Sequence, residues 1–334
     1  DEGVKRQNPN PEAFRDNKSV RAYSEISYNI DDTSNIKITP YFRLTDMAFL
    51  QHFLPWQSLE ENSQKGLGVK SHYEKRYQNL TWLVGLDLDV TQGELIETQA
   101  NEFSPTIPQG EHYNYSVNAQ VYSPFAKVNW TLSEKLFLSA GLRYEHTKYD
   151  YDNKLTDGSA CDADINNCRF TRPTDQSTKF NEMSYQLGGH YLLSEQHTIY
   201  GQYSTGYRAP QATELFRLQA GQSVTELKPE QVNSIELGSR GQTQRFFYDV
   251  SAFAMHKKHF IFQDTNRQNI SNGETSHNGI EFAFGYKLPK GFYLRANATL
   301  ANHSYENALT LSRENIKGNE IDTAPQHMGS LQLG

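Results

Sequence analysis

The chain has 334 residues, of which 36% are hydrophobic, and its formal net charge is −7. It contains no run of 18 apolar residues, which excludes a transmembrane helix, while its 20 Tyr, 18 Phe and 3 Trp exceed what a disordered chain carries. The charges are spread without a basic block, so nucleic acid is not expected as a partner.

Apolar residues recur with a period of two along nearly the whole chain, which is the pattern of β-strands. In 80–91, for example, Leu86 and Leu88 alternate with Asp87 and Asp89. Each strand is therefore expected to have one apolar and one polar face. Thirteen strands are predicted, at 19–29, 35–49, 67–77, 80–95, 113–131, 136–152, 179–192, 198–207, 231–240, 245–262, 276–287, 292–303 and 325–333. The only helical segment expected is a turn or two within 210–219.

The lengths of the strands and of their connections indicate a membrane barrel. Most of the predicted strands reach the 9–11 residues or so that cross a bilayer at a tilt, whereas ordinary strands average about 5–6. Tight turns are predicted at 31–34, 78–79, 132–135, 193–197, 241–244 and 288–291, and long links at 50–66, 96–112, 153–178, 208–230, 263–275 and 304–324. Short turns at one end and long loops at the other are typical of outer-membrane barrels.

The charges of the predicted strands fit the same architecture. They alternate with the apolar residues, so they share the face that would line a hydrated lumen, where charge is tolerated, and not the face toward lipid. These residues are Arg43, Asp87, Asp89, Arg143, Glu145, Glu236, Glu281 and Arg295. The fold class expected is a transmembrane antiparallel β-barrel in contact with the lipid bilayer.

Two cysteines, Cys161 and Cys168, enclose six residues and suit a small local disulfide, which requires an oxidising compartment. Two free thiols are the alternative. Between them Asp162, Asp164 and Asn166 have the spacing of the first oxygen ligands of a calcium loop, but the expected Gly and Glu are missing from later positions. The segment is a weak calcium candidate, and no other metal site is predicted. His256 and His259 are three residues apart, so on a strand they face opposite sides.

Four short motifs lie in the region 200–240: Gly206-Tyr207-Arg208-Ala209-Pro210, Glu214-Leu215-Phe216, Leu227-Lys228-Pro229-Glu230 and Ile235-Glu236-Leu237-Gly238. In type and order they resemble the barrel of TonB-dependent outer-membrane receptors. Further matches are at 141–145 and 279–281, and at Gly318, Pro325 and His327. The resemblance is strongest over 117–334.

The resemblance implies a barrel of about 22 strands in the bacterial outer membrane. Residues 1–334 are then expected to be a partial barrel domain, with about five strands before residue 19 and four after the last predicted strand. The first 18 residues contain no apolar signal-peptide core. The plug domain and the TonB box are expected outside this chain, and TonB would act through that plug. No cofactor and no enzymatic activity are implied.

The cargo expected from the resemblance is a ferric siderophore held by the long loops. Cationic and aromatic side chains suit an anionic, aromatic chelate, and the candidates are Arg208, Arg217, Arg267, Tyr207, Phe216, Phe53 and Trp56. Each has a structural alternative as a loop anchor. For Arg208, pairing with a lumen carboxylate is the stronger expectation.

Other functions remain open at this point. A haem receptor typically has a His within the stretch that corresponds to 211–226, which has none here, although His52 or His112 in other loops could replace it. Cobalamin and glycans are further cargo classes for the same fold. A passive porin, a soluble β-rich binding module and a barrel enzyme are the alternative classes; Asp150, Asp152 and His146 could be arranged into an enzyme site, but their spacing does not require it.

Overall fold

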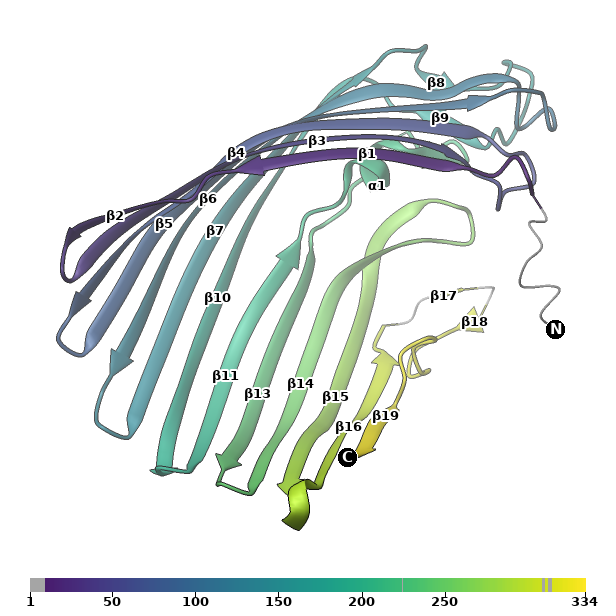
Figure 1. The fold of residues 1–334 in the computed structure, drawn as a ribbon. Helices are drawn as coiled ribbons and strands as arrows, with labels where there is room; N and C mark the ends of the chain where they lie inside the picture. The colour runs from purple at the N-terminus through teal and green to yellow at the C-terminus, as the bar shows by residue number, and fades with distance from the viewer. Residues whose placement is uncertain (1–9, 224, 308–309, 312–313) are drawn as a thin grey trace.

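The computed structural model describes residues 10–223, 225–307, 310–311 and 314–334 (Figure 1). The beginning of the N-terminal segment, Val224 and part of the predicted link 304–324 therefore lie outside the described residues. The main feature is one antiparallel sheet of 14 strands. Its strands are β1 (Arg15–Tyr23), β2 (Ile26–Asp31), β3 (Ser34–Leu50), β4 (Leu59–Tyr77), β5 (Leu80–Gln99), β6 (Gly110–Thr131), β7 (Leu136–Asn153), β10 (Gln176–Ser194), β11 (His197–Arg208), β13 (Glu230–Gln242), β14 (Phe246–Gln263), β15 (Asn269–Lys287), β16 (Tyr293–Tyr305) and β19 (His327–Leu333).

All thirteen predicted strands are present, and each lies beside its neighbour in the chain. The first is divided into β1 and β2, which both pair with β3. Several strands are longer than the apolar pattern predicts. β4 begins at Leu59, because its polar stretch 60–64 still pairs with β3 and β5 through the backbone. Ladder hydrogen bonds need no particular side chains, so polar residues extend the strands on the long-loop side.

The loops and turns contain several short helices and strands. β8 (Gly158–Ser159), β9 (Phe170–Arg172) and β12 (Leu218–Gln219) form a small three-stranded sheet, and β17 (Thr310–Leu311) pairs with β18 (Glu314–Asn315). A 3-10 turn, η2, covers Pro289–Gly291, and α1 (Ala212–Phe216) lies within the predicted segment 210–219. Among the described residues, no helix has the length and apolar character needed to span a membrane.

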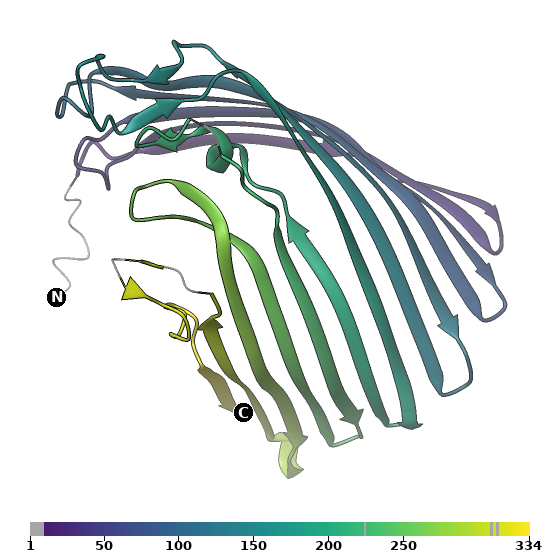
Figure 2. The ribbon, with the colours of Figure 1, turned by 180° about the vertical axis from the view of Figure 1, so that it is seen from behind.

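The sheet is strongly curved and open, with β1 and β19 at its two edges (Figures 1 and 2). In both views α1 lies on the concave side, near the end that carries the long loops. Tyr151 of β7 stacks on Phe216 of α1 with ring centroids 4.4 Å apart. Because Tyr151 and Arg143 are an even number of residues apart on one strand, they share a face, and this polar face is the concave one.

The register separates the two faces across nine strands. One row of directly opposite residues runs through β5, β6, β7, β10, β11, β13, β14, β15 and β16: Leu80, Trp130, Leu138, Gly189, Gly201, Leu237, Ala252, Ile280 and Leu300. Every member is apolar. One residue farther along β5 to β13, the row on the other face is largely polar, with Thr81, Asn129, Ser139, Gly188, Gln202 and Glu236.

Exposure confirms that the apolar face is the outer wall. Leu142 is 48% exposed and Phe282 38% exposed on the convex side. On the concave side, Arg143 donates to Asp87 at 2.9 Å, and Arg43 donates to Asp89 at the same distance. The charges thus pair across strands inside the curve, as expected for a lumen wall, and the exposed apolar side chains suit hydrocarbon.

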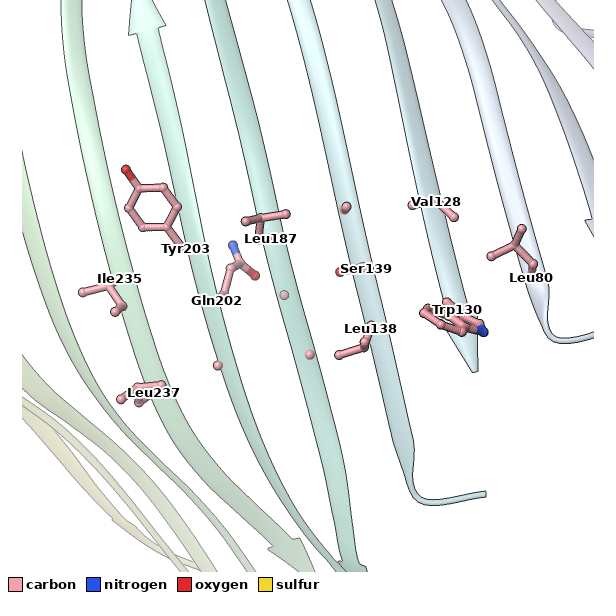
Figure 3. Close-up of a pocket in the computed structure, with 14 residues that line it drawn as sticks. Leu80, Val128, Trp130, Leu138, Ser139, Leu187, Gln202, Tyr203, Ile235 and Leu237 are labelled. Atoms are coloured by element: carbon pink, nitrogen blue, oxygen red, sulfur yellow. The ribbon is translucent and has the colours of Figure 1, made fainter. Parts of the chain in front are cut away.

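A shallow groove of about 500 Å³ interrupts the apolar row (Figure 3). Gly189 and Gly201 lie opposite each other between Leu138 and Leu237. A Cβ atom built on either glycine would lie 2.9 Å from the Cδ2 atom of the adjacent leucine. The groove therefore lies where the two glycines leave the outer wall without side chains, with the two leucines leaning toward the gap, and it is away from the long loops.

Candidate ligand-binding loops

The long connections gather at one end of the sheet and the tight turns at the other. The long links occupy 51–58, 100–109, 154–175, 209–229 and 306–326. One predicted long link, 263–275, is wrong: β14 and β15 continue to Gln263 and Asn269, which pair directly, so only 264–268 remains as a loop. The segment is polar, so its sequence gives no sign of the hairpin, whose pairing is made by backbone hydrogen bonds.

Three motif residues form one ion-pair cluster where β11 ends. Arg208 donates from Nη1 and Nη2 to the two carboxylate oxygens of Glu214, at 2.9 and 3.0 Å, and from Nε to Glu230 at 3.0 Å. Glu214 also accepts from the backbone N–H of Gln211, in a capping box at the start of α1. Lys257 donates to Glu230 as well. Arg208 thus joins the end of β11, helix α1 and the start of β13.

Phe216 and Leu215 bury the apolar side of α1 in a core at the long-loop end. They are 1% and 2% exposed, and Phe216 lies over Tyr151. The same core contains Leu95, Ile107, Tyr113, Tyr115, Val117, Phe170, Phe180, Leu227 and Ile261. In this arrangement Phe216 anchors α1 to the wall and presents no surface to solvent.

Arg217, the residue after α1, belongs to a buried polar network. Its Nη1 donates to Glu60 at 2.9 Å and its Nη2 donates to Glu97. Glu97 is 1% exposed, and its other oxygen lies 3.3 Å from Nδ1 of His112. Three segments far apart in sequence, at the start of β4, the end of β5 and the residue after α1, are therefore joined by one guanidinium group.

Each charged group of this network stabilises the charged form of its partner. Burial alone would raise the pKa of Glu97, but the hydrogen bond with His112 and the Arg217 guanidinium outweigh it, so the pKa lies below its ordinary value. Burial opposes the charge of Arg217, yet Glu97 and Glu60 together raise its pKa. Since β5 rises well beyond the 9–11 residues or so that cross a bilayer, Glu97 near its upper end lies outside the membrane.

This network predicts an acid-sensitive loop assembly. The folded pKa of Glu97 is below its ordinary value of 4.5, so its stabilising effect is complete above about pH 4.5 and is lost as the pH falls below it. In the full-length receptor, amide exchange of 100–109, corrected for the intrinsic rate, should accelerate on acidification. The variant Glu97→Gln should lose much of this dependence, while Glu134→Gln in a short turn should keep it. Equal profiles for all three proteins would contradict the prediction.

His112 is held on every side. Its Nε2 lies 2.9 Å from the carbonyl oxygen of Pro108, its Nδ1 faces Glu97, and its ring stacks on Phe170 at 3.6 Å. Neither nitrogen is free to ligate a haem iron, so the expectation that His112 could replace the missing loop histidine fails on geometry. His52 is exposed, with Nδ1 3.2 Å from the carbonyl oxygen of Leu50.

Two of the long loops, 154–175 and 209–229, are joined to each other. β9 from 154–175 pairs with β12 from 209–229, and the Tyr113 hydroxyl donates to the carbonyl oxygen of Leu218. Arg172 donates to the carbonyl oxygens of Glu111 and His112, at 2.7 and 3.0 Å. These bonds tie the loop after β7 to the loop after β11 and to the start of β6.

A disulfide joins Cys161 and Cys168, with Cα atoms 5.8 Å apart. The calcium candidates Asp162, Asp164 and Asn166 lie in the turn that it closes, where the Ile165 N–H donates to the carbonyl oxygen of Asp162. Across the described ranges, no group of three or more His, Cys, Asp or Glu side chains is placed to hold a metal ion.

Replacing Cys161 and Cys168 by Ser should open this loop locally. A cross-link that closes so short a loop stabilises by about 2–3 kcal/mol, mainly by restricting the open form. We expect faster tryptic cleavage after Arg169 in the full-length receptor, with unchanged amide exchange in β7. The unreduced and reduced parent provide the matched control. Equal cleavage rates in all three samples would contradict the prediction.

A family model described as the TonB dependent receptor-like β-barrel matches residues 3–334. The chain belongs to this family. Its members are transporters and receptors rather than enzymes, and their barrel fold implies the bacterial outer membrane. The resemblance of the four motifs to TonB-dependent receptors is therefore confirmed.

Solved structures show the same fold. The ferric citrate transporter FecA in its unliganded form superposes with a TM-score of 0.76 at 14% identity, over 97% of this chain and 47% of that one. The ferric yersiniabactin uptake receptor FyuA from Yersinia pestis gives 0.71 at 13% identity, over 98% and 48%. The copper transporter OprC gives 0.71 at 14%, over 96% and 50%. The chain thus spans about half the length of these proteins.

In this TonB-dependent receptor barrel, the seven predicted ligand residues occupy different environments. Arg208, Phe216 and Arg217 are engaged in the loop framework. Tyr207 is half-buried beside Glu145 and Arg143 on the wall. Trp56 is half-buried against the core, with the Arg169 guanidinium 4.5 Å above its ring.

The remaining two candidates are open to solvent. Phe53 is 66% exposed and stacks on Phe49 at 5.9 Å. Arg267 lies at the exposed tip of the β14–β15 hairpin, with φ of 63°, and within the described part of the chain its guanidinium has no ion-pair partner. The structure does not group these seven residues into one pocket.

Sequence reasoning missed the residues that organise the loops, chiefly Glu60, Glu97, Arg169 and Arg172. None of them belongs to a motif, and each has a partner far away in the sequence. The one available signal is an excess of arginine just after Cys168, where Arg169 and Arg172 lie in a loop otherwise rich in Asp and Asn.

Proposed function

We propose that this chain is the barrel part of a receptor that captures a ferric siderophore on its extracellular loops, for import driven by TonB through a plug outside residues 1–334. The observation that carries the proposal is the division of the loop arginines. Arg208 and Arg217 are neutralised by internal carboxylates, which makes the loops a fixed platform, whereas Arg267 remains an exposed cation. An unpaired cation together with exposed aromatic rings suits an anionic chelate.

The fold neighbours support the same cargo class. FyuA is described as a ferric yersiniabactin uptake receptor, FecA as a ferric citrate transporter and BauA from Acinetobacter baumannii as the ferric preacinetobactin receptor. Haem is disfavoured for this chain because 211–226 contains no His and His112 is fully engaged.

Direct binding tests the proposal. Full-length receptor is titrated with ferric catecholate, ferric hydroxamate and ferric citrate chelates, with haem and cobalamin, and quenching of its tryptophan fluorescence is followed. We expect one ferric chelate class to bind and to support growth as the iron source of a strain that depends on this receptor. Binding of haem or cobalamin alone would overturn the proposal.

The exposed candidates should contribute directly to that affinity. Arg267→Ala and Phe53→Ala are each expected to weaken binding of the ferric chelate about tenfold, because each removes a contact worth about 1–1.5 kcal/mol. Arg245→Ala, which removes an exposed arginine from a short turn at the opposite end, is the control and should leave affinity unchanged. Unaltered affinity in both loop variants would remove these residues from the site.

A further inference from the structure

Two histidines outside the loop network face each other across adjacent strands. His277 of β15 and His303 of β16 are direct register partners, and their Nδ1 atoms lie 2.8 Å apart. The ring centroids are separated by 5.0 Å and the ring planes are inclined by 56°. Neither residue takes part in the loop anchoring described above.

The pair lies on the concave wall at the upper edge of the apolar band. Ile280 and Leu300 are opposite each other on the outer face, and the histidines are three residues farther along each strand, so they point to the lumen. The outward residues at the same level are polar, with Asn278 opposite Asn302. The histidines therefore lie inside the wall where the lumen meets the extracellular loops.

The spacing of the two nitrogens suits a shared metal ion. Zinc and similar ions bind imidazole nitrogen at about 2.0–2.1 Å, so two nitrogens at right angles around one ion are about 2.9 Å apart. In the metal-free state a single proton between the two Nδ1 atoms gives the observed hydrogen bond. An ion that replaces that proton lies to one side of the line between the two nitrogens, so each ring must turn to direct its Nδ1 lone pair at it.

Thr275 can set the tautomer that such a site needs. Its Oγ1 lies 3.0 Å from Nε2 of His277, and Thr275 is only 5% exposed. When Nε2–H donates to this hydroxyl, the lone pair of Nδ1 points toward His303. A hydrogen bond from the second ring nitrogen is the usual way in which a ligating histidine is oriented.

The surroundings favour a thiophilic or borderline ion. Met255 is directly opposite His277 on β14 and shares its face, which places a thioether next to the His277 imidazole. The nearby Lys257 is paired with Glu230 at 3.0 Å, so its charge is compensated. Imidazole ligands favour copper over calcium or magnesium, right-angled nitrogens suit tetragonal Cu²⁺, and a thioether can serve that ion as a weak axial ligand.

We propose that His277 and His303, with Met255 next to His277, form a Cu²⁺ site on the lumen wall of this barrel. With two firm protein ligands, water fills the remaining positions. The site is separate from the loop residues of the proposed siderophore function, so either assignment can fail without the other.

The test uses the metal-free full-length receptor in detergent, titrated with CuCl₂ and followed by calorimetry and electron paramagnetic resonance. One Cu²⁺ ion should bind per chain, with a spectrum that shows coupling to two nitrogens. His277→Ala/His303→Ala should weaken binding at least about tenfold and abolish that coupling. Met255→Leu should weaken it by a smaller factor.

The matched control is His146→Ala/His256→Ala, which removes two histidines from the outer face of the same sheet. It should leave the affinity and the spectrum unchanged. Loss of binding in this control, or unchanged binding in the His277/His303 variant, would show adventitious binding to surface histidines and overturn the proposal. A parent spectrum without coupling to two nitrogens would overturn it even if the double variant failed to fold.

Discussion

Arg217→Met is expected to lower the free energy of local opening of the loop 209–229 by about 3 kcal/mol or more. The substitution keeps the length and much of the volume of the side chain but leaves Glu97, which is 1% exposed, without its cation. Removing one partner of a buried ion pair typically costs about 3–5 kcal/mol, because the remaining charge stays buried and unpaired. The effect should spread from α1 to the ends of β4 and β5, where Glu60 and Glu97 lie.

Hydrogen exchange of the full-length receptor measures this cost. Amides of 209–229 and 100–109 should exchange roughly a hundredfold faster in Arg217→Met, since about 1.4 kcal/mol corresponds to a factor of ten. Arg245→Met, at an exposed position in a short turn, is the matched control and should behave as the parent. If the loops of Arg217→Met exchange at the parent rate, the ion-pair network stabilises the closed loops no more than an apolar side chain in the same place does.

Leu142→Arg is expected to destabilise the folded barrel by about 2–4 kcal/mol in a bilayer, the cost of a cation on the lipid face near the midplane. Leu142 is 48% exposed on the convex wall, in the same row as Val84 of β5 and Ala126 of β6. The guanidinium would have to displace hydrocarbon contacts or reach along the wall toward water.

Gln186→Arg provides the control on the opposite face. Gln186 of β10 is the register partner of Gly141, the residue next to Leu142, and it is exposed on the concave wall. Urea unfolding in lipid vesicles should show a large loss for Leu142→Arg and less than about 1 kcal/mol for Gln186→Arg. The reverse order would mean that the apolar face is not the one in contact with lipid.

Local sequence patterns were sufficient to predict the strands and which residues lie on each of their two faces. Leu142 and Arg143 are adjacent in the chain yet lie on opposite sides of the wall, because side chains alternate along any extended strand. The alternation of short turns with long links likewise predicted which end of the sheet has the long loops. The exception is the predicted link 263–275, which is a hairpin with a loop at 264–268. The motif from Arg208 to Glu230 indicated the family, and its ends meet in one ion-pair cluster.

What only the tertiary structure decided is which distant residues meet. Arg217 lies 157 residues from Glu60 and 120 from Glu97, and Tyr113 lies 105 residues from the carbonyl group that its hydroxyl contacts. No period or motif specifies such pairs, since they form only when the strands are in register and the loops fold over the same rim. The His277–His303 pair has the same origin: each histidine is unremarkable in its own strand, and a shift of one residue in register would separate them.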